Sequence, residues 1–289
     1  MPGFKTIALI GRFRSAGVAK AIGTLGEYLR KQGRTVLVEK ETAAANGVTG
    51  FPVADYDEIG ARADLVVVQG GDGSMLNAAR NLAGHDVSLV GVNQGRLGFM
   101  TDIASPKMIE AIAEILAGKH ATEERTMLAA EVHRDGVVTL ATLALNDAVV
   151  NKGSVGRLIE FVVNIDGEFV YDLRADGLIV ATPTGSTAYA LSSDGPIMQP
   201  SVPGFALVPI CPHTLSNRPI MVSDRSTIEI SLKRASDARL HFDGQLQRDL
   251  LEGDRVVIRR AEHTIKFVHP PGYSYFTMLR EKLHWSEGL

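Results

Sequence analysis

The sequence predicts two domains, an N-terminal α/β domain and a C-terminal domain built mainly of strands. Over residues 1–117, short apolar strands alternate with amphipathic helices, the pattern of an open, mostly parallel sheet covered by helices. From about residue 126, short β-rich runs follow one another, separated by Asp-Gly, Gly or Pro. We expect the α/β domain at residues 1–120, the β-rich domain at 121–271, and a helical segment, 272–289, that rejoins the first domain.

In the first domain, apolar runs and helical spacings predict four strands and four helices. Two helix ends have the usual end residues: Gly33 fits the C-terminus of one helix, and Ser105 is expected to cap another, whose first position is Pro106. Residues 43–55 read as a surface loop with some helix. The expected strands are 6–10, 35–38, 65–68 and 87–92, and the expected helices are 16–32, 55–63, 74–82 and 105–116.

In the second domain, three Asp-Gly pairs stand between β-rich runs and predict hairpin turns at Asp135-Gly136, Asp166-Gly167 and Asp243-Gly244. The residues from 273 to 285 are expected to be helical again. The expected strands are 128–132, 137–145, 159–165, 178–181, 205–210, 227–232, 239–242 and 255–260.

Composition excludes several classes of protein. The chain has 289 residues, 45% of them hydrophobic, and a net charge of −3, which does not fit a general nucleic-acid binder. No stretch has the pattern of a signal peptide or the length of a membrane span, so we expect a cytoplasmic protein with no membrane partner. Cys211 is the single cysteine, which agrees with a reducing compartment, and it is expected to be buried.

The stretch from residue 65 to residue 82 carries the first candidate site. A buried strand, 65–68, leads into Gly70-Gly71-Asp72-Gly73, and a helix follows from Ser74. Glycines let a ligand approach the backbone, and the start of a helix attracts anions, so this turn suits a phosphate. Asp72 places a carboxylate in this turn, and a carboxylate beside a phosphate is electrostatically unfavourable. Its presence therefore suggests a role, either to bind Mg²⁺ or to take a proton from an attacking hydroxyl.

This turn fits other known phosphate motifs poorly. It is a poor dinucleotide fingerprint, because Leu76 stands where the third glycine belongs and no acidic residue follows at the usual distance. No Walker-type sequence occurs. A merely tight connection between strand and helix remains an alternative. A second glycine-containing loop, 93–99, follows the next strand and is expected at the same edge of the sheet.

The second candidate site lies in the β-rich half, in residues 174–196. Hydroxyls, a proline and a glycine gather at 182–187, a helix is expected next, and Tyr189 can stack on a base. Asn146 and Asp147 end an earlier run, and an amide beside a carboxylate can grip a ribose diol or a base edge. The alternatives are an ordinary Ser/Thr helix cap and a plain Asn-Asp turn.

Taken together, Gly-Gly-Asp-Gly at 70–73, Asn-Asp at 146–147 and Asp-Gly-Leu-Ile-Val-Ala-Thr-Pro-Thr-Gly-Ser-Thr-Ala-Tyr at 176–189 resemble the NAD kinase family. The resemblance extends from the first strand to the tail, and its third motif is highly specific. It implies a first domain similar to phosphofructokinase and diacylglycerol kinase, a β-sandwich-like second domain, and a C-terminal segment that returns to the first. It also implies transfer of phosphate from ATP, or polyphosphate, to the 2′-hydroxyl of the adenosine ribose of NAD, with a divalent metal such as Mg²⁺, by a homodimer or homotetramer.

The resemblance also implies roles for particular residues. Asp72 matches the proton acceptor, Gly73 binds beside it, and Asn146 and Asp147 match the pair that grips NAD. The phosphate loop would consist of Gly70, Gly71, Gly73 and Ser74, and no protein side chain is assigned as a metal ligand. The remaining expected dinucleotide contacts are Arg157, Arg174, Asp176, Thr187, Ala188, Tyr189, Ala190, Leu191, Ser192 and Gln245.

Three positions depart from the family pattern. Ser74 stands where Thr or Asn is common, Asp147 is shorter than the Glu often found there, and Asp194 replaces a glycine. Two other classes of function remain as alternatives. A lipid or sphingoid kinase would share the Gly-Gly-Asp-Gly turn without needing the third motif, and a non-catalytic NAD(P)-binding regulator would have no need of Asp72.

Overall fold

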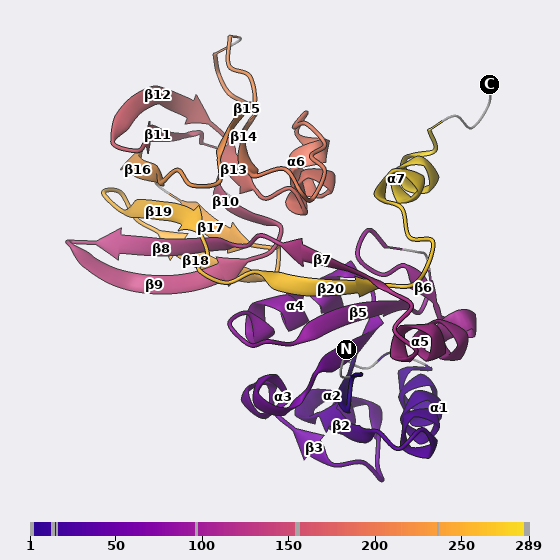
Figure 1. Ribbon diagram of the computed structural model, residues 1–289. Coiled ribbons are helices and arrows are strands. Elements are labelled where there is room, and N and C mark those ends of the chain that lie inside the picture. The colour runs from indigo at the N-terminus through magenta and orange to yellow at the C-terminus, as the bar shows by residue number, and fades with distance from the viewer. Residues whose placement is uncertain are drawn as a thin grey trace. The chain divides into compact units, whose positions relative to one another are not determined.

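The computed structural model describes residues 3–12, 15, 17–95, 98–153, 157–214, 216–235 and 237–285. The chain forms two compact units, residues 1–124 with 265–289 and residues 125–264 (Figure 1). Residues 121–124 and 265–271 were expected in the second domain, but they belong to the first unit. Strands β7 (Ala121–Arg125) and β20 (Ile265–His269) are neighbours in its sheet, where β20 also pairs with β5. Ala16, the expected start of the first helix, and Arg96 and Leu97 of the second glycine loop lie outside the described residues.

The first unit contains an eight-stranded sheet in the order β3-β2-β1-β4-β5-β20-β7, with β6 beside β5. The pairs from β3 to β20 are parallel, as the alternating pattern predicts. The order reverses between β1 and β4, and ligands bind at such a switch point, outside the carboxyl ends of the strands. The strands are β1 (Thr6–Gly11), β2 (Thr35–Glu39), β3 (Val53–Ala54), β4 (Leu65–Gly70), β5 (Ser88–Asn93), β6 (Ile103–Ala104) and β7 (Ala121–Arg125).

Helices cover both faces of this sheet. α1 (Val18–Lys31) and α5 (Met108–Leu116) share one apolar core with the sheet, while α3 (Tyr56–Arg62) contacts α4 (Asp72–Leu82), which packs on β4 and β5. α2 (Lys40–Asn46) begins before the predicted loop at 43–55 and includes its first four residues. α7 (Tyr275–Leu283) buries Met278 and Leu279. No helix in the described part of the chain is long and apolar enough to span a bilayer.

Two predicted helix starts are wrong. Ser105 does not cap α5, because it lies inside a 3₁₀ turn, Ser105–Lys107, that precedes the helix, and the N-cap residue of α5 is Lys107. α4 begins at Asp72 and not at Ser74, so the helix includes the aspartate and Gly73. This shift places Asp72 in the first helical turn.

The second unit contains two antiparallel six-stranded sheets. Large apolar side chains from both sheets, such as Phe161, Phe205 and Phe242, form one shared core, which confirms the expected β-sandwich. One sheet has the order β15 (Ile220–Ser223), β14 (Gly204–Ile210), β13 (Gly177–Ala181), β10 (Asp147–Lys152), β17 (Ala238–Phe242) and β18 (Leu246–Leu250). The other has the order β12 (Glu168–Ala175), β11 (Ile159–Ile165), β16 (Ile228–Arg234), β19 (Arg255–Arg260), β8 (Leu128–Arg134) and β9 (Val137–Ala144).

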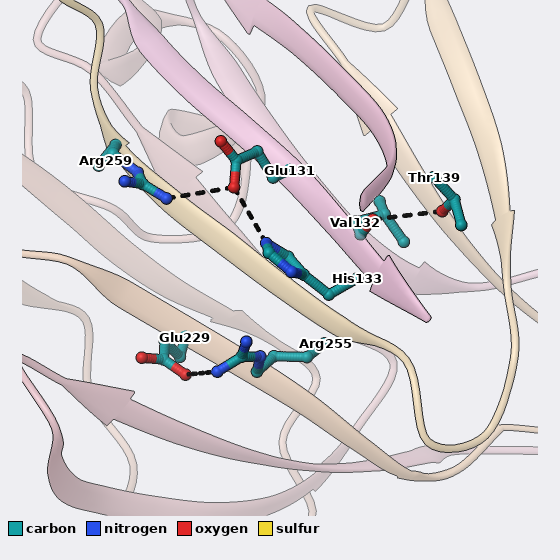
Figure 2. Close-up of polar contacts among 7 residues, drawn as sticks. All are labelled: Glu131, Val132, His133, Thr139, Glu229, Arg255 and Arg259. Atoms are coloured by element: carbon teal, nitrogen blue, oxygen red, sulfur yellow. Dashed lines mark hydrogen bonds and ion pairs between the residues drawn. The ribbon is translucent and has the colours of Figure 1, made fainter. Parts of the chain in front are cut away.

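The outward face of the β12–β9 sheet is charged. Glu131 accepts a hydrogen bond from Arg259 (3.2 Å) and lies 2.9 Å from Nε2 of His133, and Arg255 donates to Glu229 at 3.0 Å (Figure 2). Exposed pairs of this kind stabilise a fold by about 0–1 kcal/mol each. The apolar core is therefore the main source of stability in this unit.

All three predicted Asp-Gly hairpins are present. The aspartates have φ values of 52°, 53° and 52° and the following glycines 80°, 82° and 64°, the left-handed conformation that such turns require. Cys211 is a correction, because it is exposed and not buried. It follows the last residue of β14 with φ 44°, so the chain has already left the buried sheet at this position.

Candidate active site

The turn between β4 and α4 has the geometry of an anion site. β4 ends at Gly70, Gly71 is extended (φ −117°, ψ −170°), and α4 begins at Asp72. A side chain at Gly70 would collide with Ser74, so this glycine permits the close turn. The positive end of the α4 dipole points into the turn, which favours a phosphate there.

The Asp72 carboxylate is held by the second glycine loop. Oδ2 accepts from the backbone N–H of Phe99 (2.8 Å) and Oδ1 accepts from that of Met100 (2.9 Å). A Cβ on Gly98 would collide with this carboxylate, so Gly98 allows the loop to approach it. The two glycine loops therefore meet at one edge of the sheet, as predicted.

Side chains at the strand ends fix the second loop. Thr101 Oγ1 accepts from Asn93 Nδ2 (3.0 Å) and from the N–H of Gly98 (3.2 Å), while Gln94 donates to Gln69 (2.7 Å). These bonds join the ends of β4 and β5 to the segment that holds Asp72. The phosphate half-site, which comprises residues 70–74 and 98–100, is thus preorganised.

Arg12 is a further residue near the phosphate turn that no sequence motif indicated. It follows the last residue of β1, its N–H donates to Gln69 O (2.9 Å), and its Cβ lies 3.6 Å from where a Cβ of Gly70 would be. Its side chain is exposed. A basic residue placed directly after a strand of the predicted parallel sheet was the available signal, because all such positions meet at the ligand-binding edge.

The second unit has a cavity of about 380 Å³, within the range of small-molecule sites. β10 and β17 are neighbouring strands and provide its floor, because alternate residues of a strand face the same side. The lining of this cavity, called here the Asn146 pocket, is Asn146, Asp147, Val149, Asn151, Ala188, Tyr189, His241, Asp243 and Gly244.

Asn146 is poised to bind a ligand. It is 8% exposed, and among the described residues its Oδ1 atom has no hydrogen-bond partner. Its backbone carbonyl accepts from Thr182 N (2.8 Å), and the Thr182 hydroxyl donates to Leu145 O (2.5 Å). An unpaired buried oxygen costs about 1–3 kcal/mol, which a ligand donor would remove.

The Asp147 carboxyl has a raised pKa. Burial, and then the negative charge of Asp243, raise the pKa of Asp147 to about 7. Burial and Arg239 lower the pKa of His241 in the same pocket. Near neutral pH the Asp147 carboxyl therefore holds a proton far more readily than an ordinary aspartate does, and the His241 imidazole favours its neutral form.

The hydroxyls at 182–187 were expected to face a ligand, and the structure gives several of them an internal role. Ser186 is fully buried, donates to Pro183 O (2.6 Å) and accepts from Met198 N (2.9 Å), and Thr187 donates to Thr184 O (3.3 Å). The helix expected next is short, a 3₁₀ turn at Gly185–Thr187 and then α6 (Tyr189–Ser192). The residues directly before these helices, Thr184 and Ala188, make no side-chain cap, but the Thr182 hydroxyl accepts from the N–H of Gly185 (3.2 Å), so one hydroxyl of the stretch does cap the 3₁₀ turn.

The expected ligand residues around α6 have different surroundings. Tyr189 is 43% exposed and lines the Asn146 pocket together with Ala188, as base stacking would require. Ala190 is fully buried in an apolar cluster, and Leu191 and Ser192 continue the turn towards the surface. Asp194 follows with φ 63°. Glycine suits this left-handed conformation and aspartate tolerates it, which explains the departure from the family pattern.

Four other expected contacts lie outside the lining of the Asn146 pocket. Arg157 and Arg174 line a separate hollow of about 650 Å³ with Arg234, called here the arginine hollow. Asp176 is paired with Lys152 (2.7 Å). Gln245 is exposed in the hairpin that begins at Asp243, where its N–H donates to Phe242 O (2.9 Å).

A phosphate turn on a doubly wound sheet, an aspartate fixed beside it and a nucleoside-sized pocket in a β-sandwich define a nucleotide-dependent kinase. Comparisons with known proteins also indicate a kinase. Residues 7–120 match the family model of the ATP-NAD kinase N-terminal domain, and residues 145–270 match that of the C-terminal domain. The chain belongs to the ATP-NAD kinase family.

Relatives and solved structures cover the whole chain. It is 56% identical to the NAD kinase of Aromatoleum aromaticum over 98% of this chain and 95% of that one, and 51% identical to that of Thiobacillus denitrificans over 99% of both. A yeast NADH kinase solved with NADH superposes with a TM-score of 0.91 at 25% identity, over 100% of this chain and 90% of that one. An Archaeoglobus fulgidus NAD kinase solved with ATP superposes with a TM-score of 0.77 at 24% identity, over 96% of this chain and 98% of that one.

Proposed function

We propose that this chain transfers the γ-phosphoryl group of ATP to the 2′-hydroxyl of the adenosine ribose of NAD, giving NADP and ADP. The observation that carries the proposal is Asp72, fixed by two backbone N–H groups at the start of a helix that follows a phosphate turn. The relatives named NAD kinase, at about half identity over the full chain, support the choice of acceptor. They also disfavour a lipid kinase and a non-catalytic regulator.

The phosphate half-site and the Asn146 pocket would bind different parts of the substrates. The glycine turn and the N-terminus of α4 would bind the donor phosphates, and the Asn146 pocket would bind a nucleoside part of NAD. Asp72 would accept the proton of the 2′-hydroxyl as the phosphoryl group moves in line. Positioning contributes up to about 7–11 kcal/mol in such reactions. A general base contributes a factor of about 10²–10⁴.

The residues fit a divalent metal that arrives with the nucleotide. Within the described ranges, no group of three or more His, Cys, Asp or Glu could hold a metal ion alone. Mg²⁺ is usually bound through one or two carboxylates together with substrate phosphates, and Asp72 is the carboxylate available in the phosphate half-site. When bound, Mg²⁺ would neutralise charge on the phosphates.

We also propose that the protein is a cytoplasmic homodimer or homotetramer. The arginine hollow supports this, because Arg157 and Arg174 do not line the Asn146 pocket although the family uses both positions for dinucleotide contacts. In an oligomer whose sites are completed across subunits, these arginines would serve a neighbouring subunit's ligand.

The proposed function is tested by one coupled assay of NADP formation with purified protein. ATP or polyphosphate would be offered as donor and NAD, NADH or diacylglycerol as acceptor, with and without Mg²⁺. We expect metal-dependent phosphorylation of the dinucleotide and none of the lipid. Binding of NAD without consumption of any donor would overturn the proposal in favour of a regulator.

A further inference from the structure

Asp243 makes more hydrogen bonds to backbone than its place in a hairpin turn requires. It lies between β17 and β18 and is 8% exposed. Its carboxylate accepts from the N–H groups of Asn146 (2.7 Å), Leu145 (3.2 Å) and Asp147 (3.3 Å). Its own N–H donates to Asp147 O (3.0 Å). One side chain, almost a hundred residues away in sequence, thus accepts from three consecutive amides.

These bonds fix the backbone on which the pocket's polar groups stand. Asp243 holds the N–H side of residues 145–147, and Thr182 holds the carbonyl side through Leu145 and Asn146. Gly185 packs so closely against the Asn146 carbonyl that a Cβ there would collide with it. Held on both sides, Asn146 lines the pocket, and its buried Oδ1 has no partner among the described residues.

Asp243 also acts on its neighbour through charge. The titratable groups that line the Asn146 pocket are Asp147 on β10, Asp243 and His241 on the β17 side, and Tyr189 on α6. A negative charge close to a second buried carboxyl disfavours ionisation of that carboxyl, so the carboxylate of Asp243 favours a proton on Asp147. Burial, and then the charge of Asp243, raise the pKa of Asp147 to about 7.

We propose that Asp243 is a positioning residue for NAD recognition, whose carboxylate holds Asn146 and Asp147 in the ligand-binding conformation. Its charge has a second effect, since it keeps the Asp147 carboxyl available as a hydrogen-bond donor near neutral pH. The inference rests on the proposed function and adds to it a residue that the sequence pattern had placed only in a hairpin turn.

The chain provides matched controls for this inference. Asp135 and Asp166 occupy the same position in the other two Asp-Gly hairpins, with φ values of 52° and 53° against 52° for Asp243. Asp166 also caps a distant backbone, since its Oδ1 accepts from Thr227 N (2.8 Å), yet it does not line the Asn146 pocket. Asparagine tolerates the left-handed conformation as well as aspartate does, so Asp→Asn preserves each turn.

The experiment compares Asp243→Asn, Asp166→Asn and Asp135→Asn in the full-length protein. An amide in place of the Asp243 carboxylate weakens the acceptor and turns an N–H towards backbone N–H groups. We expect Asp243→Asn to raise the KM for NAD at least tenfold, with the KM for ATP within twofold, and to weaken calorimetric NAD binding without ATP by a similar factor. Asp166→Asn should lower the melting temperature without changing NAD binding, and Asp135→Asn should change neither.

A pH series separates positioning from general damage to the fold. In the wild type, NAD affinity should change between about pH 6 and 8 as Asp147 titrates, and in Asp243→Asn this change should move to lower pH. If Asp243→Asn lowers only the melting temperature and leaves the KM for NAD, its binding and its pH profile unchanged, Asp243 is a structural turn residue and the inference is overturned. A wild-type protein that binds NAD without phosphorylating it would refute the proposed function but leave the binding test of Asp243 intact.

Discussion

The N–H of Phe99 donates to Oδ2 of Asp72 at 2.8 Å, and this bond joins the two glycine loops of the α/β unit. Met100 does the same for the other carboxylate oxygen, so neither oxygen is free to rotate away from the turn. Each oxygen still has a lone pair for a proton or a metal ion. The arrangement fixes the carboxylate before any substrate arrives.

Asp72→Asn therefore tests the chemistry most directly. If Asp72 is the base, kcat should fall by roughly 10²–10⁴, while NAD binding measured by calorimetry without ATP changes little or tightens. If Asp72 instead contacts Mg²⁺, a higher concentration of Mg²⁺ should restore part of the kcat that Asp72→Asn loses.

The amide introduced by Asp72→Asn has only one oxygen and cannot accept both backbone hydrogen bonds as the carboxylate does, so a melting curve must accompany the kinetics. Near-normal kcat in a folded Asp72→Asn protein would contradict both roles. The glycine turn would then be a phosphate cradle or a structural connection.

Asn146→Ala tests the nucleoside pocket. Because Oδ1 of Asn146 is buried and unpaired within the described structure, a bound ligand should donate to it, and its loss should raise the KM for NAD about tenfold or more. The KM for ATP should change much less. Steady-state kinetics with each substrate varied in turn is the measurement, and equal effects on both substrates would remove Asn146 from dinucleotide recognition.

Arg12→Ala tests the cation beside the phosphate turn. Arg12 begins beside Gly70, and the loss of its positive charge should raise the KM for ATP severalfold and leave NAD binding unchanged, with a smaller difference at high salt because exposed charges are screened. Arg30→Ala is the control, since Arg30 is also partly exposed but pairs with Glu27 on α1. An effect of the same size in both variants would show that the charge of Arg12 has no specific role.

The sequence predicted the fold well because its signals were local. β-branched runs, helical spacing and Asp-Gly pairs determine strands, helices and hairpins over a few residues, and the order of these elements determined the α/β unit. Strands such as β12 and β18 were missed because most of their side chains face solvent, so they lack the apolar signal that the analysis used.

The candidate site was predicted only in part, because its contacts are long-range. Asp72 and Asn146 stand in motifs that are visible in the sequence. The amides of Phe99 and Met100 and the carboxylate of Asp243 act on residues 27, 28 and 97 positions away, and no local pattern records such contacts. Conversely, the hydroxyl-rich motif at 182–187 suggested ligand contacts, whereas Ser186 is used inside its own loop.

The arginine hollow predicts an oligomer. If Arg157 and Arg174 serve a neighbouring subunit's ligand, the protein should be a dimer or tetramer by light scattering at micromolar concentration. Arg174→Ala should then weaken NAD binding although Arg174 does not line the Asn146 pocket. Arg248→Ala is a control, since Arg248 is exposed on β18 and lines neither the pocket nor the hollow. A monomer with full activity would contradict this prediction.

Asp147 predicts a particular dependence of stability on pH. Its pKa is about 7 in the folded protein and about 3.9 in an unfolded chain, so between these values the folded state retains a proton that the unfolded state has lost. The contribution of Asp147 to the free energy of unfolding should therefore decrease as pH rises from about 4 to 7, and stay level above that. Asp147→Asn removes the titrating group but keeps its size, so the difference between wild type and variant, measured by denaturant unfolding across this range, isolates its contribution. We expect the variant to gain stability relative to the wild type as pH rises. A difference that stays constant from pH 4 to 8 would show that Asp147 is ionised throughout, and that the Asp243 charge beside it is compensated in the folded protein.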